Sequence, residues 1–251
     1  MKPEIAAKLR ALNAQFYQTF GLAFATTRRR LQPGILRILP RLPLAARWLD
    51  LGCAHGEIAR WLVQHRFQGH YLGLDFSPVL LAEAQAWTAQ LKPDLSARFT
   101  FHQADLGNSA WIEALEGQQF DVVLAFAVLH HIPGQANRLR LLAQVRTRLH
   151  EEGYLVLSVW QFQNSPRLLA RRQSWAQVGI DPADLEPGDT LLDWRHTLPD
   201  QPENVGLRYV HQFDRQELAA LASASGFYVE ETFESDGEGG RLGLYQIWRP
   251  D

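Results

Sequence analysis

The chain has 251 residues, of which 46% are hydrophobic and 21% are charged, and its formal net charge is −2 at pH 7. These values suit one folded domain with a sizeable core and exclude a largely disordered chain. A lone cysteine, Cys53, excludes an internal disulfide and a cysteine-based zinc site, and no apolar run is long enough to cross a bilayer. Because no apolar signal core opens the sequence, we expect a cytoplasmic protein that does not associate with membranes.

Segments typical of helices and of strands alternate along the chain. An amphipathic helix over residues 4–20 comes first, because apolar residues recur there at helical spacing. Ser77 followed by Pro78 predicts a later helix start, since serine is a good N-cap and proline suits the first helical position. The other predicted helices span residues 35–39, 57–65, 109–115, 135–150 and 214–225, and the predicted strands span 47–51, 71–74, 97–102, 120–126, 154–160, 227–233 and 242–248.

This alternation predicts an α/β fold with a doubly wound, mostly parallel sheet of seven strands, because parallel strands need helical crossovers between them. The turn over residues 236–240 joins the last two strands and predicts a C-terminal antiparallel hairpin. Residues 161–213 interrupt the rhythm and are rich in proline, glycine and aspartate, so we expect an insertion with a short helix near 166–177.

Acidic residues stand at the ends of the first three predicted strands. Asp50 precedes the small-residue turn 52–56, Asp75 ends the second strand, and Asp105 follows the third. Ligands of open α/β sheets bind beyond these carboxyl ends, where a carboxylate can accept hydrogen bonds from ribose hydroxyls or an adenine amino group. The turn fits neither G-x-G-x-x-G nor the glycine-rich loop of nucleotide triphosphate sites. Helix capping is the structural alternative for the three acids.

The acids and the turn Asp50-Leu51-Gly52-Cys53-Ala54-His55-Gly56 resemble the class I S-adenosylmethionine-dependent methyltransferases over residues 46–160 and 226–249. The resemblance implies that the turn holds the methionine part, Asp75 the ribose and Asp105 the adenine edge. Tyr17 either contacts the cofactor carboxylate or completes the first helix. The predicted cofactor-binding residues are Tyr17, Asp50, Gly52, Cys53, Ala54, Gly56, Asp75, Phe76, Asp105, Leu106, Ala125 and Phe126.

A narrower resemblance covers most of the chain. Residues 24–28 (FATTR), 127–131 (AVLHH), 159–160 (VW), 189–194 (DTLLDW) and 208–213 (RYVHQF) are similar to segments of the tRNA wobble-uridine carboxymethyl methyltransferases. This resemblance implies methyl transfer to the carboxylate of 5-carboxymethyluridine, with tRNA as partner and a small zinc-binding activator subunit as a second partner. We expect one domain over residues 1–251, made of a helical lid (1–45), a cofactor-binding core (46–160), a substrate-side insertion (161–213) and a C-terminal helix and hairpin (214–251).

A carboxylate is already ionised at neutral pH, so this reaction needs no strong general base and depends on alignment and desolvation. The candidate catalytic residues are Arg28, His130, Trp160, Arg208, Tyr209 and His211. The two arginines are candidates to hold the carboxylate, Tyr209 and His211 to donate hydrogen bonds, and Trp160 to stack on the base. Structural alternatives stay open: Arg28 could pair with an acid, and Trp160 could be part of the core. We expect His130 to line the pocket, whereas His131 could cap the following helix. We expect no metal site, because the adjacent histidines lack further ligands.

Two other functions stay open. A small-molecule O-, N- or C-methyltransferase would share the scaffold and have a closed apolar pocket, whereas tRNA would need an open basic face around residues 28–30 and 167–172. Arginines on a solvated face are the simpler explanation of those clusters. A protein of another class, which binds the cofactor without catalysis and assists RNA modification, would also retain the three acids.

Overall fold

The computed structural model describes residues 1–26, 30–196 and 204–251, and for residues 22, 24–26 and 196 it describes the backbone alone. Arg28, one of the predicted catalytic residues, therefore lies outside the described residues. Among the helices of the described ranges, none is long and apolar enough to cross a membrane.

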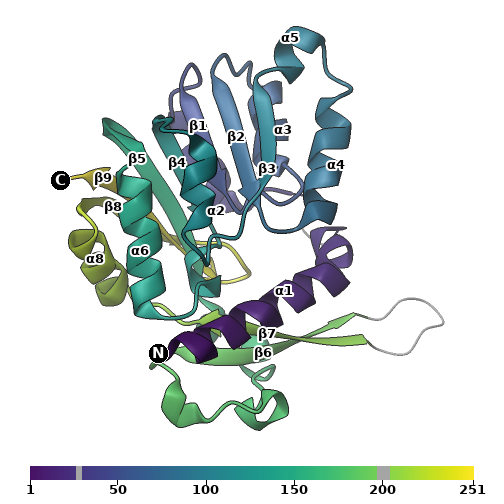
Figure 1. Ribbon diagram of the computed structural model, residues 1–251, viewed down its shortest axis with the longest axis vertical. Coiled ribbons are helices and arrows are strands. Elements are labelled where there is room, and N and C mark those ends of the chain that lie inside the picture. The colour runs from purple at the N-terminus through teal and green to yellow at the C-terminus, as the bar shows by residue number, and fades with distance from the viewer. Residues whose placement is uncertain (27–29, 197–203) are drawn as a thin grey trace.

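Seven strands form one sheet in the order β3-β2-β1-β4-β5-β9-β8, which confirms the predicted fold class (Figure 1). The first five strands are parallel, and β9 runs antiparallel between β5 and β8. Strand order reverses between β1 and β4, which is where ligands bind in such sheets. The strands are β1 (Arg47–Leu51), β2 (His70–Asp75), β3 (Phe99–Gln103), β4 (Phe120–Phe126), β5 (Leu149–Trp160), β8 (Phe227–Ser235) and β9 (Gly243–Pro250).

Helices cover both faces of the sheet, because successive residues of each strand point to opposite sides. On β1, Leu49 joins the cluster formed with α6 and α8, whereas Trp48 joins the cluster formed with α2, α3 and α4. On β4, Val123 belongs to the cluster with α6 and α8, and Val122 belongs to the cluster with α2, α3 and α4. The helices are α1 (Pro3–Thr26), α2 (Pro33–Ile38), α3 (Glu57–Gln64), α4 (Pro78–Thr88), α5 (Pro93–Ser96), α6 (Gln135–Arg146), α7 (Pro166–Leu169) and α8 (Arg215–Ala224), with short 3-10 helices at Leu39–Arg41, Ala110–Leu115, Leu129–His131, Phe162–Asn164, Trp175–Val178 and Pro182–Asp184.

The insertion differs from its prediction. It carries a separate two-stranded antiparallel sheet, made of β6 (Asp189–His196) and β7 (Asn204–His211), which the sequence analysis missed. Residues 208–211 are buried without alternation, so the period of two that signals a strand is absent. The helix predicted near 166–177 is the single turn α7 followed by a 3-10 turn.

The first helix is longer than predicted and continues to Thr26. Gly21 lies inside it, because a single glycine costs a helix only about 1 kcal/mol and does not end it. Figure 1 shows α1 crossing the carboxyl ends of the central strands, with the hairpin β6–β7 on its other side. α1 is thus placed between the sheet and the hairpin.

Candidate functional site

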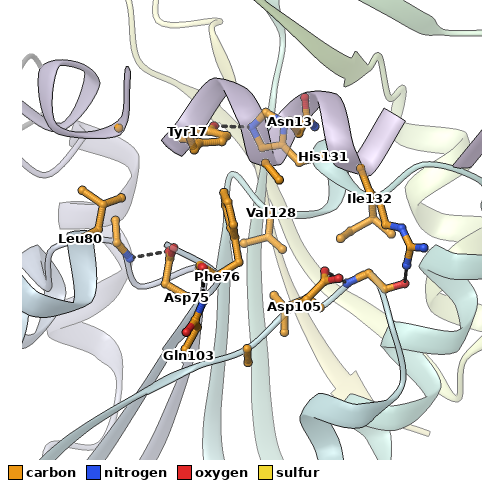
Figure 2. Close-up of a pocket in the computed structure, with 18 of the residues that line it drawn as sticks. Asn13, Tyr17, Asp75, Phe76, Leu80, Gln103, Asp105, Val128, His131 and Ile132 are labelled. Carbon is orange, nitrogen blue, oxygen red and sulfur yellow. Dashed lines mark hydrogen bonds between the residues drawn. The ribbon is translucent and has the colours of Figure 1, made fainter. Parts of the chain in front are cut away.

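A cleft of about 630 Å³ lies at the carboxyl ends of β1 to β4, under α1 (Figure 2). This volume falls within the usual range for small-molecule and cofactor sites, roughly 300–1,000 Å³. The lining residues are Ala7, Arg10, Ala11, Asn13, Ala14, Tyr17, Gln18 and Gly21 of α1, Gly52, Ala54 and His55 after β1, Asp75, Phe76 and Leu80 after β2, 103–107 after β3, and Phe126, Ala127, Val128, His131 and Ile132 after β4.

Asp75 is the buried acid at the centre of this cleft. Its Oδ2 accepts a hydrogen bond from the Ala54 N–H at 2.9 Å, and its Oδ1 accepts one from the Ser77 N–H at 2.9 Å. Burial raises the pKa of Asp75, although these backbone donors oppose the rise. A carboxylate offers about four acceptor positions, so each oxygen can still accept one hydroxyl proton. Asp75 therefore fits the pair of hydroxyls on a ribose.

The turn after β1 brings its backbone to the same place. Gly52 has φ +76°, a left-handed conformation that glycine adopts without strain. A Cβ at Gly52 would lie 2.8 Å from Cγ2 of Val128, so this glycine also allows a close approach of two cleft walls. Ala54, where a second glycine is common in the resembling family, has φ +47° and still donates its N–H to Asp75.

Asp105 stands on the opposite side of the cleft. Its Oδ1 accepts from the Gly107 N–H at 2.8 Å, and its Oδ2 accepts from the Asn108 side chain at 3.1 Å. The Gly107 carbonyl in turn accepts from Arg140 at 2.7 Å and from Arg10 of α1. The loop that carries Asp105 is thus held by the core and by the covering helix, and it presents a carboxylate and backbone to the cleft.

The covering helix presents small side chains to the cleft. Ala7, Ala11, Ala14 and Gly21 recur at intervals of three, four and seven residues, so they lie on one face of α1. Tyr17, on the same face, packs edge-on against Phe76 with ring centroids 5.5 Å apart. The cleft lies against this face of the helix. The helical spacing of small residues is the signal by which the sequence could have revealed this face.

Four predicted cofactor residues lie outside the cleft lining. Asp50 is 2% exposed and accepts a hydrogen bond from the Tyr71 hydroxyl at 2.6 Å. Burial, opposed by this hydrogen bond, raises the pKa of Asp50 to about 7. Cys53 and Ala125 are buried in the core, and Gly56 lies against α4. Asp50, predicted to bind the cofactor, is therefore buried beside Tyr71 and does not line the cleft.

The two adjacent histidines differ from their predicted positions. His130 is 2% exposed, and its Nδ1 accepts from the Trp160 N–H at 3.2 Å. His131 lines the cleft, where its Nε2 lies 3.0 Å from the Tyr17 hydroxyl (Figure 2). Its Nδ1 lies 3.3 Å from the Tyr209 carbonyl. Both residues belong to one 3-10 turn, so neighbouring side chains point in different directions. The prediction that His130 lines the pocket is wrong, and His131 has that place.

Tyr209 and His211, predicted as hydrogen-bond partners of the substrate, are instead fully buried. The Tyr209 hydroxyl donates to Asp189 at 2.8 Å, and His211 contacts Asp189 at 2.7 Å and Glu217 at 3.0 Å. Burial lowers the pKa of His211, but the hydrogen bonds to the two carboxylates outweigh it, so the net shift is upward. These residues hold β6, β7 and α8 together and do not face the cleft.

The same cluster contains three residues of the types that bind metal ions, namely Glu186, Asp189 and His211. One possible ligand atom from each lies within 4.8 Å of the other two. The buried guanidinium of Arg138 donates to Glu186 at 2.7 Å and lies 3.5 Å from Glu217. Since the buried cation of Arg138 offsets the acids and His211 is hydrogen-bonded to two of them, a polar network accounts for this cluster.

Arg208 and Trp160 lie together beside α1. Arg208 is 4% exposed, and its guanidinium lies 4.8 Å from the ring centre of Trp160 and 5.4 Å from that of Phe16. Trp160 is half-buried at the end of β5. Both predicted residues are thus close to the wall formed by α1 and the hairpin. The cleft residues that the sequence analysis missed, among them Arg10, Asn13, His55, Leu80 and Gln103, carried no local signal apart from the spacing on α1.

The chain matches the model of the methyltransferase domain family over residues 24–232. It belongs to this family. The match and the shared fold confirm the predicted enzyme class and cofactor, namely an S-adenosylmethionine-dependent methyltransferase.

Individual methyltransferases resemble the chain to different extents. The tRNA (carboxymethyluridine(34)-5-O)-methyltransferase of Schizosaccharomyces pombe is 22% identical over 242 residues, which cover 88% of this chain and 91% of that enzyme. The trans-aconitate 2-methyltransferase of Streptomyces avermitilis is 33% identical over 119 residues, which cover 47% of this chain and only 42% of that enzyme. The glycopeptide N-methyltransferase MtfA, solved with S-adenosyl-L-homocysteine, shares the fold with a TM-score of 0.62 at 16% identity, over 88% of this chain and 87% of MtfA.

Proposed function

We propose that this methyltransferase esterifies a carboxylate, and that its acceptor is 5-carboxymethyluridine at the wobble position of tRNA. The observation that carries the proposal is the contact between two segments that resemble this family. Asp189, from the segment 189–194, is bonded to Tyr209 and His211, from the segment 208–213. Residues that are distant in the sequence thus form one supporting unit behind Arg208, the candidate cation for the acceptor.

The cofactor half of the site rests on the residues of the cleft. The Asp75 carboxylate accepts hydrogen bonds from the two ribose hydroxyls. Asp105 and the Leu106 N–H bind the adenine edge, and the turn that begins at Gly52 holds the methionine part. Phe76 and Tyr17, whose rings are in contact, cover the adenine and ribose from the side of α1. The two carboxylates suit a ligand rich in hydrogen-bond donors.

The acceptor half lies where α1 meets the hairpin and the end of β5. Arg208 supplies a buried cation, and the half-buried ring of Trp160, 4.8 Å from it, offers a face for a base. A guanidinium among aromatic rings binds a carboxylate more strongly than the same group in water would, because little solvent competes. Arg208 and Trp160 therefore keep the roles predicted for them.

When bound, S-adenosylmethionine supplies a methyl group whose bond to sulfur breaks, with its electron pair remaining on sulfur, as the bond to the acceptor oxygen forms. A negative carboxylate and a positive sulfonium give a neutral ester and a neutral thioether, so no proton has to move. The chain's residues therefore align the carboxylate and exclude water, which favours the loss of charge. No residue of the cleft therefore has to act as a general base.

A carboxylate acceptor agrees with both curated relatives, since carboxymethyluridine and trans-aconitate each carry one. The relative named for tRNA matches 88% of this chain, whereas the relative named for trans-aconitate matches 47%. Part of the basic cluster in the insertion is engaged within the protein, because Arg171 pairs with Asp193 and Arg172 donates to Gln212. Arg167 is exposed and free to contribute to a tRNA-binding face.

The test is methyl transfer from labelled S-adenosylmethionine to tRNA that carries 5-carboxymethyluridine, with trans-aconitate as the competing acceptor. The expected result is the nucleoside methyl ester, resolved by mass spectrometry. Arg208→Met should abolish transfer and leave S-adenosylhomocysteine binding within about threefold. Arg215→Met, which removes a guanidinium 60% exposed on α8, is the matched control and should retain full transfer.

Each other outcome has a defined meaning. Transfer to trans-aconitate alone would refute the tRNA acceptor and keep the carboxylate chemistry. Transfer that appears only after addition of a small zinc-binding activator subunit would support both predicted partners. Cofactor binding without transfer to either acceptor would refute carboxyl methylation and favour the accessory role.

A further inference from the structure

Two faces of the covering helix α1 contact different parts of the protein. One face lines the cofactor cleft through Ala7, Ala11 and Ala14. The other packs on β7, where the Phe16 side chain is 2% exposed. Because the same helix touches the ligand site and the acceptor wall, any change in its position reaches both.

Asn13 connects these two faces. Its side chain lines the cleft and is 6% exposed. Its Oδ1 accepts from the Tyr209 N–H at 2.8 Å, and its Nδ2 donates to the Tyr209 carbonyl at 3.1 Å. One side-chain amide thus pairs with both backbone groups of a β7 residue, as a neighbouring strand would. A buried pair of this kind fixes position, since loss of either partner leaves a polar group unsatisfied.

The packing around this pair is close. A Cβ on Gly206 of β7 would lie 2.5 Å from the Phe20 ring and 2.7 Å from the Phe16 ring, so only glycine lets α1 approach the strand this closely. Trp194 of β6 meets the same two rings, at centroid distances of 5.4 and 5.9 Å. On its cleft side, α1 is bonded to the loop of Asp105 through Arg10 and to His131 through Tyr17.

We propose that Asn13 is a positioning residue that couples occupancy of the cofactor cleft to the order of the hairpin β6–β7, the wall against which the acceptor binds. This rests on the cofactor part of the proposed function and does not depend on the identity of the acceptor. A ligand in the cleft holds α1 in place, and Asn13 transmits this to the backbone of Tyr209. The cofactor therefore prepares the wall before the acceptor arrives, and the coupling is reciprocal, as binding linkage requires.

The test is hydrogen exchange of the backbone amides of β7 with and without S-adenosylhomocysteine, with its affinity measured by calorimetry. In the unmodified protein, the ligand should slow exchange at Tyr209 and its neighbours by about tenfold or more. Asn13→Ala should reduce this effect on β7 to less than about threefold, while the loop of Asp105 keeps its ligand-dependent protection. Gln15→Ala, which removes an exposed polar side chain of α1 outside the cleft lining, is the matched control and should retain the full effect.

Asn13→Asp guards against misfolding of the alanine variant. Aspartate still accepts from the Tyr209 N–H but cannot donate to its carbonyl, so this variant should show a reduced but measurable effect on β7. Protection of β7 that is equal in all variants, or absent from the unmodified protein despite binding, would overturn the coupling alone. Absence of S-adenosylhomocysteine binding would overturn the cofactor assignment and the coupling together.

Discussion

The Asp50 carboxyl group is almost inaccessible to water, near the end of β1 and close in sequence to the turn that lines the cleft. Asp50 accepts a hydrogen bond from the Tyr71 hydroxyl at 2.6 Å. Burial, only partly opposed by this bond, raises its pKa from 3.8 to about 7, and the neighbouring charge of Asp75 adds to the rise. In the unfolded chain the same group loses its proton near its ordinary pKa. Folded and unfolded states therefore bind different numbers of protons between about pH 4 and pH 7.

The sign of the effect follows from this difference. In that pH range the folded state holds the proton more tightly, so raising the pH favours the unfolded state and lowers the free energy of unfolding. Each pKa unit corresponds to about 1.4 kcal/mol, so the two units from pH 5 to pH 7 remove roughly 3 kcal/mol through Asp50 alone. Above pH 7 the loss is complete and this contribution becomes constant.

Asp50→Asn removes the charge and keeps the size and an oxygen acceptor for Tyr71. We expect the variant to unfold at higher urea concentration than the unmodified protein at pH 8. The difference in free energy of unfolding between the two should shrink by roughly 3 kcal/mol at pH 5. Asp94→Asn, on the exposed first turn of α5, is the control for loss of one carboxylate and should change stability by less than about 0.5 kcal/mol at either pH. A difference for Asp50→Asn that is the same at pH 5 and pH 8 would refute the reasoning.

Three further substitutions test the site and its support. Asp75→Asn should weaken S-adenosylhomocysteine binding by about tenfold to a hundredfold in calorimetry, since it loses charge-assisted hydrogen bonds; affinity unchanged by this variant would remove Asp75 from the ribose site. Gly52→Ala forces a side chain into φ +76°, 2.8 Å from Val128; thermal unfolding should show a loss of about 1–2 kcal/mol, with weaker ligand binding. Arg138→Met leaves Glu186 and Glu217 without their buried cation; urea unfolding should show a loss of about 3 kcal/mol or more, and equal stability would contradict the polar network.

The sequence alone predicted the parallel sheet, its C-terminal hairpin and the acids at the strand ends. These features are local, because hydrophobic periodicity defines each strand and helix. Right-handed crossover connections then bring the ends of consecutive strands to one edge of the sheet. Asp75 and Asp105 could be placed on the cleft for that reason. The placement of Asp50 failed because strand residues alternate in direction, and its neighbours in the fold decide what its side chain meets.

The tertiary structure decided what covers the cleft and what packs behind the hairpin β6–β7. His130 and His131 are equivalent in the sequence, and packing against Trp160 and Tyr17 determines which of them faces the cleft. From the sequence, Tyr209 and His211 were predicted to bind the substrate. In the structure, both are instead hydrogen-bonded to Asp189. Asn13 shows no motif, because its role exists only where a helix from the start of the chain meets a strand 196 residues later. Contacts of such separation depend on how elements pack, and no local pattern encodes them.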